Sequence, residues 1–265
     1  LADLVRSTLR LRPDRIIVAA THYNFKSVFA WNVILYSGMT GIIAVYLWTM
    51  FERKLNPYSK AAGLAALVWR FVLTTGTGSI FAFLTARQAY GSALLAPLFI
   101  VLSFGWGLAV FLIVQATMYK WTGLTLDDAI QRRMARLLGV FIAASLYLVA
   151  VYHLTNLYFA RQGAFEAFIL RDGGVYSQLF WLGYVVLGAL LPLALLFHPK
   201  CTGARWTFAA SVLVVGGAFA WLYVFIIGGQ AFPLEIFPGS VVSSSFGAGA
   251  VAAYSPSLPE LLLGI

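Results

Sequence analysis

The sequence predicts an all-α protein whose helices form a bundle that spans a membrane several times. Of its 265 residues, 61% are hydrophobic and only 10% are charged. A soluble domain carries about 25% charged residues, so this chain has too few to cover a surface exposed to water. Its apolar runs are also long enough to cross a bilayer core, which takes about 20 helical residues. The runs lack the period-two alternation of membrane strands, and helices satisfy their own backbone groups in lipid.

The expected spans follow one another along the whole chain, and basic residues stand beside them. In chain order, the runs and a basic residue that borders each are 28–50 before Arg53, 61–84 after Lys60, 94–119 before Lys120, 137–158 after Arg136, 178–197 before Lys200 and 207–228 after Arg205. No internal repeat or low-complexity linker divides them. Residues 1–265 are therefore predicted to form a single transmembrane domain. Because the chain opens on Leu1 and ends as a new apolar run begins, we expect a fragment of a longer bundle.

The net charge of +9 indicates membrane topology and contact with anionic headgroups rather than nucleic acid. Basic residues are most frequent in the short loops on the side reached after the first span, here called side B. The positive-inside rule makes side B cytoplasmic, which leaves the opposite side, side A, periplasmic in a bacterial inner membrane. The segment before the first span weakens this bias, because it adds basic residues to side A, where they would meet a protein partner.

Metal chemistry is not expected in this chain. Cys201 is the single cysteine, and His22, His153 and His198 are far apart in the sequence. Neither a disulfide framework nor a thiolate cage can be built from this set. A haem held by histidines of two helices is disfavoured, because only His153 falls within a predicted span.

The second span carries a charge and a polar, glycine-rich stretch. Arg70 lies about ten residues beyond Lys60, near the middle of the bilayer at about 1.5 Å per residue. A charge at that depth usually faces a partner or a water-filled cavity. Two interpretations stay open: Arg70, Thr75 and Thr77 line a proton or ion path, or Arg70 forms a structural ion pair with an acid outside these helices. The small residues beside them serve either close helix packing or a groove for a flat ligand.

Polar side chains gather at the side A ends of four spans. They are Asn32 and Tyr36 in the first span, Arg87 and Tyr90 after the second, His153 and Asn156 in the fourth, and Gln230 after the sixth. A quinone head needs hydrogen bonds to its two oxygens, an apolar slot for its tail and a group that exchanges protons, a role that suits histidine. The alternative is an interfacial belt of tyrosine and histidine side chains.

Four stretches, in this order, resemble the NrfD/PsrC family, the membrane subunits of polysulfide-reductase-like enzymes and anchors of molybdoenzymes. They are LRLRPDRIIVAATHYNFKSVFAWN, LTTGTGSIFAFLTARQAYGSALLAPLF, VYHLTNLY and FILRDGGVYSQLFW. The family's LGRP motif lacks its glycine here, and some relatives place a histidine where this chain has Thr74–Thr77. The resemblance implies a fold of eight to ten helices, no bound metal, and a menaquinone or ubiquinone site near a docked iron–sulfur subunit.

The resemblance also implies a molybdopterin catalytic subunit that handles sulfur compounds. The residues expected to meet the partner are on side A; they are Arg12, Asp14, Arg15, Glu166 and Glu235. The favoured function is thus a quinone-interacting membrane subunit that exchanges electrons with an iron–sulfur subunit. A proton- or ion-translocating subunit and a purely structural anchor remain as alternatives.

Overall fold

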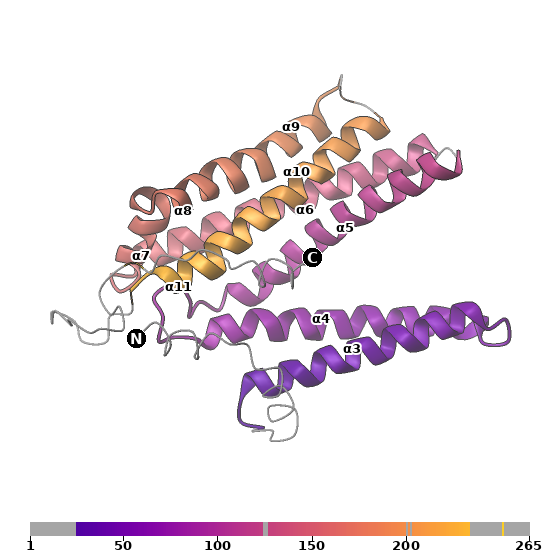
Figure 1. Ribbon diagram of the computed structural model, residues 1–265, viewed down its shortest axis with the longest axis horizontal. Coiled ribbons are helices and arrows are strands. Elements are labelled where there is room, and N and C mark those ends of the chain that lie inside the picture. The colour runs from indigo at the N-terminus through magenta and orange to yellow at the C-terminus, as the bar shows by residue number, and fades with distance from the viewer. Residues whose placement is uncertain (1–24, 124–126, 200, 202, 234–250, 252–265) are drawn as a thin grey trace, which may run out of the picture. The chain divides into compact units, whose positions relative to one another are not determined.

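The computed structural model describes residues 25–123, 127–199, 201, 203–233 and 251, and the regular elements in this part of the chain are all helical (Figure 1). Six of the described helices are long and apolar enough to cross a membrane. The prediction of an all-α, polytopic membrane bundle is therefore confirmed. The contacts of the chain group into two compact units, Leu1–Gly76 and Thr77–Ile265. The prediction of one domain over the whole chain stays a prediction.

The observed spans match the predicted runs in number and order, but several are longer. They are Ala30–Phe51, Asn56–Phe83, Leu95–Thr122, Asp128–Tyr158, Val175–Phe197 and Ala204–Ala231. The largest difference is at the start of the fourth, which begins at Asp128 rather than at residue 137. The side chain of Asp127 accepts a hydrogen bond of 3.0 Å from the backbone N–H of Ala129. This N-cap lets the helix begin in its charged segment, before the apolar run.

The first unit contains α3 (Val28–Phe51), the short 3₁₀ turn η1 (Asn56–Tyr58) and most of α4 (Ser59–Phe83). The indole N–H of Trp69 donates to the carbonyl of Leu35 at 2.8 Å, and the ring of Trp69 lies against Gly38. A side chain at Gly38 would overlap that ring. Most large apolar side chains of α3 and α4 are exposed, as expected where the surrounding solvent is lipid.

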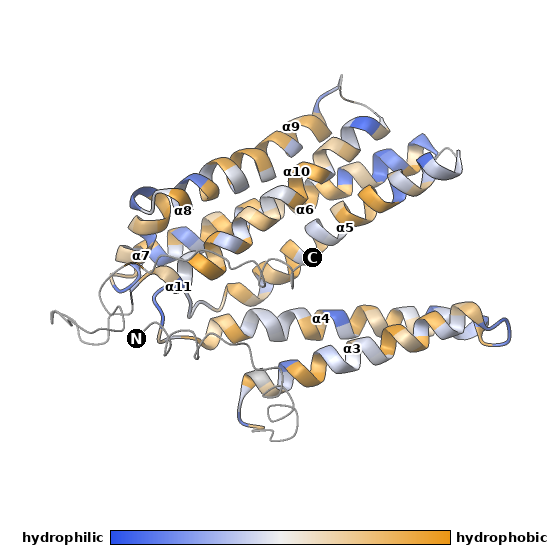
Figure 2. Cartoon of the chain, viewed as in Figure 1, coloured by the Kyte–Doolittle hydropathy of each residue, from blue (hydrophilic) through white to orange (hydrophobic). Residues whose placement is uncertain are grey.

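The second unit begins with the end of α4 and continues to the end of the chain. Its described elements are α5 (Leu95–Thr122), α6 (Asp128–Tyr158), α7 (Gly163–Ala167), η2 (Phe168–Asp172), α8 (Val175–Gln178), η3 (Leu179–Leu190), α9 (Leu191–Phe197), α10 (Ala204–Tyr223), η4 (Val224–Gly228) and α11 (Gly229–Ala231). Helix α10 packs against α5, η3 and α9, while α6 packs against α5 and α9 (Figure 1). Figure 2 shows apolar residues along these helices and hydrophilic ones near their ends.

Glycines let two helices of this unit touch through their backbones. A Cβ atom built on Gly188 of η3 would lie only 2.6 Å from the Cα atom of Gly217 of α10. Larger residues at this crossing would force the helices apart. Small residues are a common means of close helix packing in membranes, where dispersion contacts replace the hydrophobic effect.

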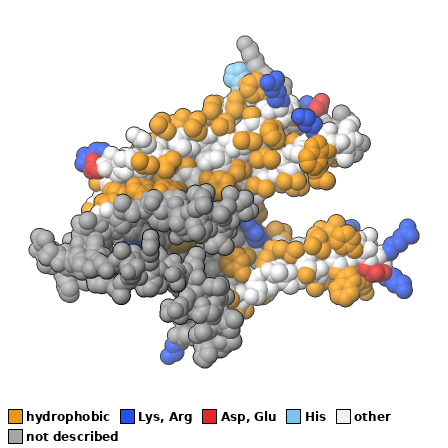
Figure 3. Space-filling view, in the orientation of Figure 1, with side chains coloured by type: hydrophobic (Ala, Val, Ile, Leu, Met, Phe, Trp, Pro, Cys, Tyr) orange, Lys and Arg blue, Asp and Glu red, His pale blue; other side chains and the backbone are white. Residues whose placement is uncertain are grey.

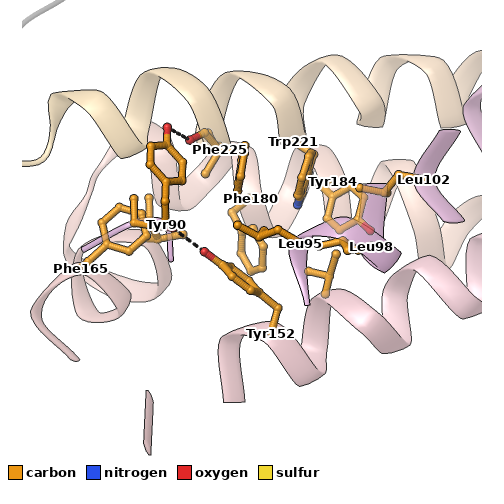
Figure 4. Close-up of a cluster of buried hydrophobic side chains, with 14 residues drawn as sticks. Tyr90, Leu95, Leu98, Leu102, Tyr152, Phe165, Phe180, Tyr184, Trp221 and Phe225 are labelled. Atoms are coloured by element: carbon orange, nitrogen blue, oxygen red, sulfur yellow. Dashed lines mark hydrogen bonds between the residues drawn. The ribbon is translucent and has the colours of Figure 1, made fainter. Parts of the chain in front are cut away.

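An aromatic and aliphatic core fills the space between α5, η3 and α10 (Figure 4). Leu95, Leu98 and Leu102 come from α5 and are almost fully buried. The rings of Trp221 and Phe225 stack at a centroid distance of 4.8 Å and an interplanar angle of 9°. This core supports the end of the unit where α6 ends and α7 begins, and that end carries the candidate site.

Candidate functional site

A cavity lies where the connection between α4 and α5 meets the end of α6. Its volume is about 480 Å³, which is within the range of small-molecule sites. The lining residues fall between positions 85 and 94 and between positions 155 and 162. Leu94 and Phe159 supply apolar surface, whereas Arg87, Asn156 and Gln162 supply polar groups. The cavity thus combines an apolar lining with a few polar groups, as binding sites for flat organic ligands do.

A buried carboxylate lies directly behind this cavity. Glu166 of α7 is 0% exposed, and its Oε2 atom lies 2.6 Å from Nδ1 of His153. Its Oε1 atom accepts a hydrogen bond of 2.8 Å from Nδ2 of Asn156. His153 and Asn156 are three residues apart on one face of α6, so α7 covers both of them at once. A buried charge persists only when it is paired and hydrogen-bonded, and here both carboxylate oxygens have partners.

The contacts of two amide side chains fix the direction in which their oxygens point. Nδ2 of Asn156 donates to Glu166, and Nε2 of Gln162 donates to the carbonyl of Tyr90 at 3.3 Å. Each nitrogen faces an acceptor, so each oxygen must take the other position on its amide. Oδ1 of Asn156 and Oε1 of Gln162 are buried and have no hydrogen-bond partner among the described residues. Both residues line the cavity, which therefore offers two acceptors to a ligand that carries donors.

Two arginines hold the connection between α4 and α5 in place. Nη1 of Arg87 donates to the carbonyl of Gln230 at 2.9 Å, and Nη2 of Arg161 donates to the carbonyl of Thr85 at 2.9 Å. Both arginines line the cavity. Within the described part of the chain, neither has a carboxylate within ion-pair distance. The cavity wall therefore keeps a positive charge close to the buried Glu166.

Two buried tyrosines connect this region to the core (Figure 4). The hydroxyl of Tyr90 donates to the carbonyl of Phe225 at 3.0 Å, beside the wide π-helical turn η4. The hydroxyl of Tyr152 donates to the carbonyl of Ala89 at 2.5 Å. Burial raises the pKa of Tyr90 to about 12, although the nearby charge of Arg87 acts in the opposite direction. Tyr90 is thus neutral near physiological pH and serves as a hydrogen-bond donor.

His153 lies beside the cavity rather than in its lining. Its ring packs edge-on against Phe180 of η3 at a centroid distance of 4.8 Å. Together with Tyr152, Phe165 and Trp221 it lines a much smaller apolar space. His153 therefore connects the polar cluster with the aromatic core, one hydrogen-bonded residue behind the cavity.

The structure brings together five of the residues predicted to bind a quinone. Arg87, Tyr90 and Asn156 line the cavity, His153 lies behind it, and the main chain of Gln230 holds Arg87. Asn32 and Tyr36 belong to α3 in the first unit, so their part in the site stays a prediction.

The other predicted residues have separate outcomes. Arg70 and Thr75 lie in α4 in the first unit, where Arg70 is exposed and the hydroxyl of Thr75 donates to the carbonyl of Phe71 at 2.8 Å. Thr77 is the first residue of the second unit. A proton path through these three residues stays a prediction. Arg12, Asp14, Arg15 and Glu235, predicted to meet a partner, lie outside the described residues.

Glu166 was expected on an exposed docking surface, but the structure places it in the buried cluster. Its apolar neighbours in the stretch GAFEAFIL were a signal of burial. Gln162 and Arg161 were not predicted from the sequence, because they follow α6 and reach the cavity only where the chain folds back over it. Among the described residues, no group of three or more His, Cys, Asp or Glu side chains is placed to hold a metal ion.

Comparisons with known proteins agree with this architecture. The family model described as polysulphide reductase, NrfD, matches residues 4–234. An integral membrane subunit of an Hdr-like menaquinol oxidoreductase from Archaeoglobus fulgidus is 32% identical over 249 residues, which is 92% of this chain and 62% of that protein. A Halobacterium salinarum protein, provisionally described as a membrane subunit of dimethyl sulfoxide reductase, is 28% identical over 289 residues, covering 96% and 65%. The chain thus spans less than two thirds of these relatives, and no solved structure matches it significantly.

Proposed function

We propose that this chain, which belongs to the polysulphide reductase NrfD family, is the quinol-interacting membrane subunit of a multi-subunit redox complex. The family membership and the name of the menaquinol oxidoreductase relative support this assignment. The observation that carries it is the cavity beside α6, with Oδ1 of Asn156 buried in its wall and unpaired among the described residues. A buried acceptor of this kind is costly unless a ligand satisfies it.

The chemistry of the cavity favours the reduced form of the ligand. A quinol carries two hydroxyl donors, whereas the oxidised quinone carries only acceptors. Asn156 and Gln162 each present an oxygen acceptor whose direction is fixed by the contact of the amide nitrogen. A quinol hydroxyl satisfies such an oxygen, and a quinone carbonyl does not. The apolar surface of Leu94 and Phe159 would accept the ring and the first part of the tail.

The buried pair behind the cavity gives the site a group that can hold a proton. Oxidation of a quinol releases two electrons and two protons. The short contact between His153 and Glu166 shares a proton between Nδ1 and Oε2, and Glu166 also orients Asn156. We assign His153 and Glu166 the exchange of protons, and Asn156 and Gln162 the binding of the head group. Arg87 and Arg161 keep the wall in place and place positive charge near oxygens that lose protons.

The partners belong to the same proposal. The electrons would pass to an iron–sulfur subunit, itself coupled to a molybdopterin subunit that acts on sulfur compounds. The name of the second relative, a dimethyl sulfoxide reductase membrane subunit, is consistent with such an assembly. Docking through Arg12, Asp14, Arg15 and Glu235, the placement of side A on the periplasmic face of a bacterial inner membrane, and the choice of menaquinone over ubiquinone are all parts of this proposal.

The test is an Asn156→Leu variant in the purified complex. We expect quinol oxidation and binding of a quinone-site inhibitor to fall at least tenfold, because the variant removes a buried acceptor worth about 1–3 kcal/mol. Asn56→Leu is the matched control, since Asn56 is exposed in the turn before α4 and lies outside the cavity. Equal turnover and equal inhibitor binding in the two variants would exclude the cavity as the quinol site and favour a purely structural anchor.

A further inference from the structure

A second cavity lies at the end of the second unit where α6 begins. Its volume is about 450 Å³, close to that of the first cavity. The first turns of α6, the end of α9 and the start of α10 line it. It is separated from the polar cluster by most of the length of α6, which runs from Asp128 to Tyr158. The two cavities therefore lie at opposite ends of this helix, about 30 Å apart at 1.5 Å per residue.

The charge in this cavity is predominantly positive. Arg132 and Arg136 are four residues apart on one face of α6, and both line the cavity together with His198. Among the residues described, neither arginine has an acid within ion-pair distance. Asp128 is the acid in the lining, and it lies one further turn toward the start of the helix. Figure 3 shows basic side chains and a histidine gathered at this end of the unit.

The position of the cavity along the helices matches the depth of lipid headgroups. The apolar run of α6 begins at residue 137, directly after Arg136, and α9 ends at Phe197. Leu196, Phe197 and Ala135 supply the apolar part of the lining. A ligand here would meet guanidinium groups with its head and apolar surface with the part that follows. Basic pockets between membrane helices bind anionic lipid headgroups in this way.

We propose that this cavity binds the phosphate of an anionic membrane lipid between Arg132 and Arg136. A guanidinium group presents a planar pair of N–H donors that matches two oxygens of a phosphate. Two such groups on one helix face hold a phosphodiester from the same side. The acyl or isoprenoid chains then follow the apolar surface of α6 and α9. This assignment does not depend on the proposed quinol site, because no residue is shared by the two cavities.

Native mass spectrometry of the whole protein in detergent tests the assignment. The probes are phosphatidylglycerol, phosphatidylcholine and inorganic phosphate, each added to delipidated protein. We expect phosphatidylglycerol to bind at least tenfold more tightly than phosphatidylcholine and to resist millimolar phosphate. The Arg132→Gln/Arg136→Gln double variant should weaken phosphatidylglycerol binding about tenfold or more, since each arginine contributes charge-assisted hydrogen bonds.

Arg133→Gln is the matched control, because Arg133 lies between the two arginines in sequence but does not line the cavity. It should bind phosphatidylglycerol as the unaltered protein does. The Arg132→Lys/Arg136→Lys variant, which keeps the charge and loses the paired donors, should give intermediate binding and covers the case in which the glutamine variant does not fold. Equal binding in the control and the glutamine variant would overturn the site. Displacement of the lipid by phosphate would show a site for free anions and overturn the lipid assignment.

Discussion

Replacing Glu166 with glutamine separates the two tasks proposed for this side chain. The wild-type carboxylate contacts His153 at 2.6 Å and Asn156 at 2.8 Å. Glutamine keeps an oxygen for Asn156 but removes the charge that faces His153. A hydrogen bond to a charged group contributes about 1.5–3 kcal/mol and a neutral one about 1 kcal/mol. The expected loss in the free energy of unfolding is therefore about 1–2 kcal/mol.

Alanine at the same position should be more harmful. It leaves both His153 and Asn156 without their partner inside the protein, and breaking a buried pair in this way costs about 3–5 kcal/mol. Because Glu166 is 0% exposed, water cannot easily replace the missing carboxylate. The order of stability is therefore expected to be wild type, then Glu166→Gln, then Glu166→Ala. Glu52→Gln is the matched control, since Glu52 is exposed after α3.

Steady-state quinol oxidation and inhibitor binding by the purified complex give the functional readout. Asn156 keeps its acceptor in Glu166→Gln, so inhibitor binding should change little. Proton exchange through the pair should be lost, and kcat should fall by about a hundredfold or more. A Glu166→Gln complex with wild-type kcat would refute the role of the pair in proton exchange. An unchanged unfolding temperature in Glu166→Ala would refute the energetic reasoning itself.

Three further predictions concern the packing and titration of the second unit, and Gly216→Ala serves as control for the first two, because a Cβ there has no neighbour within 4 Å. Gly229→Ala places a Cβ 2.7 Å from the hydroxyl oxygen of Tyr90, and overpacking of this kind should lower the free energy of unfolding by about 1–3 kcal/mol in denaturant titrations. Gly217→Ala drives a Cβ into the backbone of Gly188 and should lower the thermal unfolding temperature more than the control does. Burial raises the pKa of Tyr90 from 10.0 to about 12, so the unfolded phenol ionises first and stability should fall as pH rises from about 10 to 12; Tyr90→Phe should remove part of that fall.

The positions of the spans could be predicted from sequence because lipid imposes a simple requirement. Each crossing needs an uninterrupted apolar helix, so the runs at residues 61–84 and 94–119 correspond closely to α4 and α5. The same criterion says little about where a helix ends in water. The cap at Asp127 and the charged first turns of α6 lie beyond the apolar run, and for this reason the predicted start was late.

The candidate site was predictable where neighbours along one helix carry it. His153 and Asn156 share a face by their spacing alone, and the structure keeps them together on Glu166. Gln162 and Glu166 could not be placed in this way, because their roles depend on α7 folding back over α6. The orientation of the Asn156 and Gln162 amides is likewise a tertiary property, since each depends on an acceptor at least ten residues away in sequence.

Photolabelling with an azido-substituted menaquinol analogue tests most directly whether the cavity beside α6 binds quinol. The purified complex would be labelled, digested and mapped by mass spectrometry, with and without excess unmodified quinol. We expect protectable labels in the two segments that line the cavity, residues 85–94 and 155–162, and their loss in Asn156→Leu. Protectable labels confined to other segments, with these two unmodified, would contradict the assignment.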